Sequence, residues 1–258
     1  LLGELEGIYG ECLDLPMQAI RQNAACCVRS ALRKTKLGKA SIEMDGGHRL
    51  CVHVQAKGDG IVIDFAGTSA QVQSNLNAPR AVVRAAVLYV LRCLVADEIP
   101  LNDGCLEAVE IRIPDGTMLS PAPGAAVVGG NVETSQAVVD GLLSAFGLLA
   151  GSQGTMNNLT FGDGTRQYYE TICGGAGAGE GFEGADAVHT HMTNSLLTDP
   201  EVLEGRYPIR LESFGLRKGS GGKGRWRGGD GVIRAVRFLE PMHVSLLSGR
   251  RVVPPRGM

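Results

Sequence analysis

The sequence lacks the features that define several common classes of protein. No apolar run approaches the roughly 20 residues that a membrane-spanning helix needs. Excess charge of one sign is also absent, because the net charge is −2, and this argues against general nucleic-acid binding. The seven cysteines form no C-x-x-C pair, which excludes a zinc knuckle and a thioredoxin motif. Scattered single thiols are typical of a reducing cytosol.

Signatures of nucleotide binding are missing as well. The run Gly179–Gly184 fits G-x-G-x-x-G, but no helical pattern follows it, so we interpret it as a turned loop. The stretch KGSGGKGR fails as a phosphate-binding loop, because Lys223 is followed by glycine instead of serine or threonine. The N-terminal LLGELEG has no signal-peptide character and no initiator methionine. We therefore expect the chain to be a piece of a longer protein.

Glycine is what the sequence has in excess, at 37 of 258 residues, where the usual share is about 7%. The excess is uneven, since residues 151–258 hold 21 of the 37. Apolar residues make up 44% of the chain and charged residues 20%, as in globular proteins. We predict a mixed α/β (α+β) fold with mixed sheets. Residues 1–150 form its helix and strand part, and residues 151–258 form a glycine-rich part dominated by strands.

Hydrophobic periodicity predicts two buried helices, at residues 74–95 and 131–151. Asn77 is the expected N-cap of the first. Gly141 and Gly147 fall inside the second, where each costs about 1 kcal/mol relative to alanine, so we expect close packing against another backbone there. The other predicted elements are a helix at 14–35 and strands at 45–55, 60–67, 107–116, 156–162, 165–172, 207–217, 231–240 and 243–249.

Candidate site residues gather around GGAGAGEGFEGADAVHTHMTN, residues 174–194. We predict that this backbone forms a wall of an active site, where successive N–H groups bind an anion. His189 and His191 would face the same side of a strand, which suits two metal ligands or a catalytic acid beside a phosphate. A metal needs a further ligand, which Asp186 or Glu170 would supply only through folding. An ordinary polar strand end is the alternative for the histidines.

The entry to the helix at 131–151 is a second candidate, because free N–H groups after its Gly-Gly-Asn would attract an anion. A plain cap is the alternative. Glu170 ends the strand that runs into the glycine stretch and is well placed for proton transfer, although a surface acid fits too. The candidate catalytic residues are Glu170, His189 and His191, and the candidate substrate-binding residues are Gly130, Asn131, Ser135, Gln136, Gly174, Gly175, Gly177 and Asn194.

Residues 217–237 are strongly basic, with seven lysines or arginines against one acid, Asp230. The string RWRGGDG is similar to an RNA-binding RGG tract, but it stands between predicted strands and does not repeat. We interpret this region as a solvated basic turn.

Several long strings resemble one family. SNLNAPRAVVRAAVLYVLRCL, VVGGNVETSQAVVDGLLSAFG, YYETICGGAGAG and RKGSGGKGRWRGGDGVIR occur in this order. They look like the hydantoinase B/oxoprolinase family, in particular the C-terminal region of its ATP-dependent 5-oxoprolinases. The resemblance runs from about Phe65 to the end and is looser before it. It implies ATP-driven hydrolysis of the lactam ring of 5-oxoproline to glutamate, within glutathione metabolism in the cytoplasm.

The resemblance also implies which parts lie elsewhere. A hydantoinase A-type module, in the same or a partner chain, binds ATP, and the ligands of any divalent metal lie upstream. Relatives include N-methylhydantoinase and acetone or acetophenone carboxylase subunits, so a B-type subunit of that kind is an alternative function. A non-catalytic assembly module for an ATP-binding partner is an alternative of another class. We expect no nucleic-acid or membrane partner, a homo-oligomer in the full-length form, and neither turnover nor good solubility from this piece alone.

Overall fold

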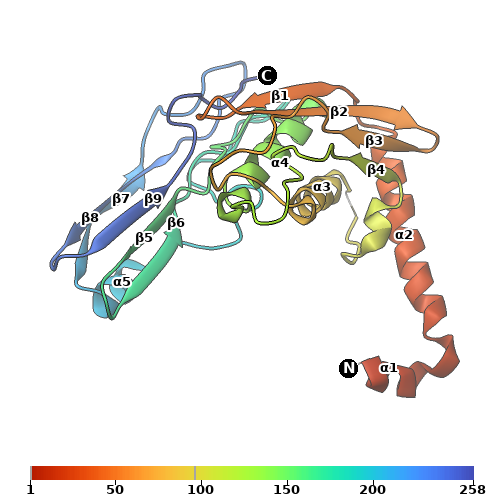
Figure 1. The fold of residues 1–258 in the computed structure, drawn as a ribbon, viewed down its shortest axis with the longest axis horizontal. Coiled ribbons are helices and arrows are strands. Elements are labelled where there is room, and N and C mark those ends of the chain that lie inside the picture. The colour runs from red at the N-terminus through yellow and green to blue at the C-terminus, as the bar shows by residue number, and fades with distance from the viewer. Residues whose placement is uncertain (1, 96) are drawn as a thin grey trace.

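The computed structural model describes residues 2–95 and 97–258, and its first part is built on a four-stranded sheet (Figure 1). The strand order is β1-β2-β3-β4, with β1, β2 and β3 antiparallel and β4 parallel to β3. The predicted strands are confirmed, whereas β1 was not predicted. The elements of this part are α1 (Leu2–Tyr9), α2 (Asp14–Leu32), β1 (Lys39–Glu43), β2 (Arg49–Lys57), β3 (Gly60–Asp64), α3 (Arg80–Leu94), β4 (Val109–Arg112) and α4 (Thr134–Ala145), with 3-10 turns at Gly10–Cys12, Asp103–Leu106 and Val128–Gly130.

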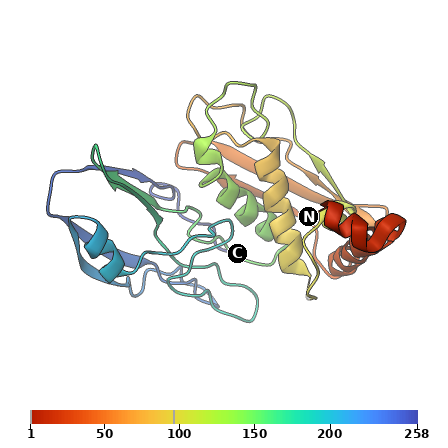
Figure 2. The same cartoon turned by 90° about the horizontal axis from the view of Figure 1, so that it is seen from below.

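Two helices cover one face of this sheet. Figure 2 shows α3, in yellow, and α4, in green, lying over the orange strands. The alternation of β2 places Leu50 and Val52 in the core, as predicted. A Cβ added to Gly141 would lie 3.4 Å from side-chain atoms of both residues and of Ile42. Gly141 therefore packs against side chains of the sheet, and the expected approach of another backbone was wrong.

Helix α2 joins the core only through its C-terminal half, where Ala24, Ala25, Val28 and Leu32 are buried. Its N-terminal half and α1 project away from the body of the chain (Figure 1). None of the helices in the described ranges is long and apolar enough to cross a membrane.

The second part consists of two smaller sheets and one short helix. β5 lies between β6 and β9 in one sheet, and β7 pairs with β8 in the other, all antiparallel. The ring of Phe161 packs against those of Tyr168, Tyr207 and Phe238, with centroids 4.7 to 5.5 Å apart. All five predicted strands are confirmed. The elements are β5 (Asn158–Gly162), β6 (Gln167–Thr171), α5 (Pro200–Arg206), β7 (Ile209–Leu216), β8 (Val232–Phe238) and β9 (His243–Leu247).

The mixed α/β class is thus confirmed, but two further details of the helices were predicted wrongly. Helix α4 ends at Ala145, so Gly147 lies outside it, with φ +65°. The N–H of Gly147 donates to Ser144 O and that of Leu148 to Leu143 O, which is the Schellman pattern of a helix end. Gly147 is required for its backbone angle and not for close packing.

Asn77 is not the N-cap of α3, since Pro79 occupies that position. The Asn77 side chain is fully buried instead, and its amide nitrogen donates to the carbonyl oxygens of Val72, Ser74 and Ala126. It joins two loops beside the helix. The division of the chain at residue 150 stays a prediction, because buried polar contacts of α4 connect the two parts.

Candidate functional site

A large open groove of about 1250 Å³ lies in the second part. We call it the glycine groove. Its walls come from residues 174–180, the segment from Arg217 to Phe238, and residues 246–258. Asp45, in the turn between β1 and β2, accepts the backbone N–H groups of Arg251, Val252 and Val253 and so fixes the third wall.

The glycine wall is a close-packed structure. A Cβ on Gly175 would lie 1.9 Å from Gly229 O, and one on Gly177 would lie 1.9 Å from Ala150 O. Any side chain there would collide with backbone, so these positions require glycine for close approach. The predicted Gly174, Gly175 and Gly177 all line the groove.

The predicted anion-binding row of N–H groups is only partly available. The N–H of Gly174 donates to Val188 O at 3.1 Å, and that of Ala176 donates to Ala185 O at 3.0 Å. Both groups are therefore already satisfied by neighbouring backbone. An anion in this groove would depend mainly on side chains.

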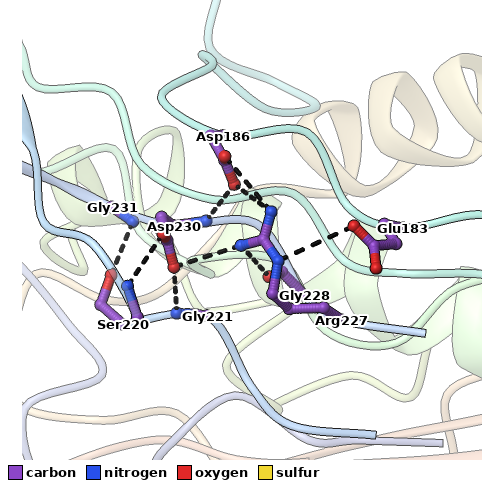
Figure 3. Close-up of polar contacts among 9 residues, drawn as sticks. Glu183, Asp186, Ser220, Gly221, Arg227, Gly228, Asp230 and Gly231 are labelled. Carbon is purple, nitrogen blue, oxygen red and sulfur yellow. Dashed lines mark hydrogen bonds and ion pairs between the residues drawn. The ribbon is translucent and has the colours of Figure 1, made fainter. Parts of the chain in front are cut away.

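An ion-pair network holds residues 219–231, the basic loop, against residues 174–186, the glycine loop (Figure 3). Asp230 accepts the N–H groups of Gly219 and Gly221, at 2.9 and 2.7 Å. These bonds hold the pKa of Asp230 below its usual value. Arg227 bridges Asp230 and Asp186, and Asp186 also accepts the N–H of Asp230 at 2.6 Å. The one acid of the basic segment thus shapes the loop.

The basic segment is more than a solvated turn, because much of it lines the groove. Arg217, Lys223 and Arg225 are exposed and contribute to this lining, and no ion pair of theirs is found among the described residues. The guanidinium of Arg225 lies over the Trp226 ring, 4.7 Å from its centroid. The single acidic residue of the lining is Glu180. The cations of the lining are Arg217, Lys223, Arg225, Arg234, Arg250, Arg251 and Arg256.

Glu170 is held by an arginine rather than open to a substrate. Its side chain is 1% exposed, and Arg234 donates to its two carboxylate oxygens at 2.8 and 3.1 Å. Tyr168 donates to it as well, at 2.6 Å. Burial, together with this bond, raises the pKa of Tyr168 to about 12. The expected role of Glu170 as a base finds no free oxygen here, whereas Arg234 reaches the groove.

The two histidines do not lie on a strand, so the expected shared strand face was wrong. His189 donates from Nε2 to the carbonyl oxygen of Thr171 at 3.0 Å. His191 adopts φ +51° and turns towards the first part. There its Nδ1 lies 3.3 Å from Tyr89 Oη, and its Nε2 lies 3.3 Å from Asp140 Oδ1. Irregular backbone at His191 replaces the predicted alternation.

The predicted metal ligands are also otherwise engaged. Asp186 pairs with Arg227, and Glu170 pairs with Arg234. In the part of the chain that the structure describes, no three His, Cys, Asp or Glu residues gather as a possible metal site.

The residues predicted at the entry to α4 lie away from the glycine groove. Ser135 donates to Asn131 O at 2.6 Å, and Gln136 donates to Thr193 Oγ1 at 2.7 Å. A Cβ on Gly130 would lie 2.2 Å from Asn77 O, so this glycine too permits close backbone contact. Asn194 is exposed and absent from the lining of the groove.

Two buried acids, one at the start of α4 and one within it, escaped the sequence analysis. Glu133 precedes the helix and Asp140 lies two turns later, on the face that meets the second part. Asp140 accepts the N–H of Ser152 at 3.1 Å, and Glu133 accepts the hydroxyl of Thr155 at 2.7 Å. Burial raises the pKa of Glu133 to about 7. The sequence did hold a signal, because Glu133 and Asp140 are seven residues apart and so fall on the same face of a largely apolar helix.

Comparison with known proteins identifies the family. The hydantoinase B/oxoprolinase profile matches residues 4–258. The chain is 60% identical to 5-oxoprolinase 1 of Arabidopsis thaliana over 76% of its length, and 47% identical to 5-oxoprolinase of Saccharomyces cerevisiae over 100%. It spans 15% and 22% of those two proteins.

A solved structure shares the fold. The ATP-dependent caprolactamase from Pseudomonas jessenii superposes with a TM-score of 0.75 at 22% identity, covering 96% of this chain and 47% of the other. Because the profile match extends over nearly the whole length, the chain belongs to the hydantoinase B/oxoprolinase family.

Proposed function

We propose that this chain is the B-type part of an ATP-dependent 5-oxoprolinase, and that the glycine groove holds the anionic, phosphorylated intermediate of lactam opening. The observation that carries the proposal is the cationic lining of the groove above a wall of close-packed glycines. 5-Oxoproline carries a carboxylate, and phosphorylation adds a second anionic group, so positive charge in a confined groove favours both. The 5-oxoprolinases of plant and yeast at 60% and 47% identity support the choice of substrate.

The chemistry requires activation, because an amide is unreactive. The γ-phosphoryl group of ATP moves to the lactam oxygen and ADP leaves. One water adds to the activated carbon, the C–N bond breaks as the nitrogen takes a proton, and an acyl phosphate remains. A second water converts it to carboxylate and phosphate. The task of this chain is to hold the anion and to move protons.

We assign ATP binding to a hydantoinase A-type module outside these residues, since the sequence offers no phosphate-binding loop. The described residues present no set of three metal-type ligands, so they do not fit a divalent metal and no step is assigned to one. The homo-oligomeric state and the cytoplasmic location stay predictions.

The predicted site residues then divide into three groups. Gly174, Gly175 and Gly177 form the wall against which the intermediate lies. Glu170 and His189 hold neighbouring structure, since Glu170 fixes Arg234 and His189 binds the end of β6. The positioning residues proposed for the joint with α4 are His191, Gly130, Asn131, Ser135, Gln136 and Asn194.

The test uses the full-length protein that contains this chain. Lys223→Ala and Arg225→Ala remove groove cations, and Arg210→Ala, at an exposed position on β7, is the matched control. We expect each groove variant to raise the KM for 5-oxoproline about tenfold, the effect of one lost charge-assisted bond, with the control unchanged. Equal kinetics in all three would refute the assignment of the groove.

Two alternatives are decided by the same preparation. ATP consumption is measured with 5-oxoproline, with N-methylhydantoin and with acetone plus bicarbonate in separate assays, and the ring-opened or carboxylated product of each is quantified, which is glutamate for 5-oxoproline. Turnover of N-methylhydantoin or acetone but not of 5-oxoproline would favour a related B-type subunit. Loss of assembly with an ATP-binding partner, at unchanged turnover of what assembles, would favour a docking module.

A further inference from the structure

A second cavity, of about 180 Å³, adjoins the glycine groove. The two share Ser248, Gly249 and Arg250, so their linings meet along this segment. The opposite side of this cavity comes from the first part, with Asp45 from the β1–β2 turn and Glu133 from the start of α4. The small cavity therefore lies where the two parts of the chain meet.

Glu133 presents one free oxygen to this cavity. The residue is 4% exposed, and its Oε1 accepts the Thr155 hydroxyl at 2.7 Å and the N–H of Met156 at 3.3 Å. Its Oε2 accepts no hydrogen bond from any described residue. A Cβ at position 249 would lie 2.7 Å from Oε2, so glycine at this position leaves that oxygen accessible.

The charges around Glu133 come from three elements. Burial raises its pKa to about 7, against the bonds from Thr155 and Met156 and the positive charge of Arg250, and Asp45 raises it further. On its own helix, Asp140 faces His191. A carboxyl that titrates near neutral pH is suited to both taking and giving a proton.

Two other buried carboxylates, Asp140 and Glu170, lack this combination. Asp140 Oδ2 also has no hydrogen-bond partner in the described ranges, but Asp140 lines neither cavity. Glu170 has both oxygens bound by Arg234. Glu133 alone among these three joins a free oxygen to an open space.

We propose that Glu133 moves the proton during opening of the activated lactam, with the five-membered ring in the small cavity and its phosphoryl group in the glycine groove. Glu133 takes a proton from the water that adds to the activated carbon. It returns that proton to the ring nitrogen as the C–N bond breaks, which leaves an acyl phosphate and a free amine. This inference rests on the proposed function.

The test measures glutamate and ADP release by the full-length protein carrying Glu133→Gln, which keeps the shape and loses the proton transfer. We expect kcat to fall at least about 100-fold, as for other acid–base residues, while KM changes less than about threefold. The wild-type kcat should rise with pH through about 7, the pKa of this carboxyl, and Glu133→Gln should lose that limb. Glu133→Asp should recover part of the rate, and Glu201→Gln, on the exposed α5, is the control.

A wild-type kcat and pH profile in Glu133→Gln would overturn the proposal. An inactive wild-type protein would instead refute the proposed function, and infrared titration would then decide the role of Glu133. A carboxyl band that titrates near pH 7 and disappears in Glu133→Gln would support it. Absence of such a band from the wild type would end it.

Discussion

The two parts of the chain reach a fixed structure by opposite means. In the first part, a continuous apolar cluster spans the sheet, α3 and α4, and it includes Leu50, Val87 and Leu142. In the second part, the buried apolar cluster is small and centres on Phe161 and Leu203. Much of what remains is backbone against backbone, at positions where glycine has no side chain. Packing of apolar side chains stabilises the first part. The second part is stabilised by close backbone packing at glycines and by buried ion pairs.

This difference determines how substitutions act. In an apolar core, a smaller side chain leaves a cavity and a matched one is tolerated. In the second part, an added methyl group meets a carbonyl oxygen, and a lost partner leaves a buried charge. The predictions below compare these two kinds of damage, beginning with the largest.

Arg234→Met should cost about 3–5 kcal/mol of unfolding free energy, because it leaves the buried Glu170 carboxylate unpaired. Both side chains are at most 2% exposed. Urea unfolding of the full-length protein that contains this chain, followed by hydrogen exchange of the second part, measures this, with Arg210→Met as the surface control. Glu170→Met combined with Arg234→Met should recover most of the loss. A loss below about 1 kcal/mol in Arg234→Met would mean that the ion pair does not hold the second part.

Glu133, which lies where the two parts of the chain meet, should make the free energy of unfolding depend on pH. Its folded pKa of about 7 lies above the ordinary value of 4.5. The contribution of the protonated Glu133 to the free energy of unfolding is therefore fully present below about pH 4.5. It is lost as the pH rises through 7, by about 3 kcal/mol in total. Urea unfolding from pH 4.5 to 8 should show this decline, and Glu133→Gln should lack it. Equal slopes in both proteins would contradict the shift.

Gly175→Ala should destabilise the second part by roughly 1–3 kcal/mol or more, since its Cβ would lie 1.9 Å from Gly229 O. Gly164→Ala is the matched control, because nothing lies within 4 Å of a Cβ there. Hydrogen exchange would locate the damage in residues 174–184 and 219–231. Wild-type protection from exchange in both loops of Gly175→Ala, residues 174–184 and 219–231, would show that they can move apart without loss of stability.

Gly141→Ala should have the smallest effect and the opposite sign. Its Cβ would make ordinary contacts at 3.4 Å with the sheet, and alanine is a better helix former by up to about 1 kcal/mol. A rise in the thermal midpoint is the expected result. A clear fall would show that the core of the first part is as intolerant of added volume as the glycine loops.

Local pattern was enough to predict most of the elements. The alternation through Leu50 and Val52 and the 3.6-residue spacing of the helix that contains Val87 each depend on neighbours in sequence. The same reasoning failed at His191, where alternation suggested a strand and tertiary contacts with Tyr89 and Asp140 imposed a turn. Periodicity records which face is buried, and not what lies against it.

The candidate site was harder to predict because its partners are remote. Glu170 and Arg234 are 64 residues apart, so nothing near Glu170 indicates that its charge is neutralised. Glu133 looks like an acid that favours a helix start, and only its burial beside Thr155 gives it a different character. The glycine wall was found from composition, since close backbone approach leaves a trace in residue type.

The position of β5 between β6 and β9 in the sheet determines the order in which its two edges can pair during folding. β6 follows β5 closely in the sequence, so one edge of β5 can pair early. The other edge pairs only with β9, where Leu159 lies opposite Leu246. Closure over such a span is slow, and during synthesis it comes after the first part has emerged. The segment that completes this sheet also supplies the last wall of the glycine groove. During synthesis the residues of the apolar core in the first part therefore emerge before the segment that completes the groove.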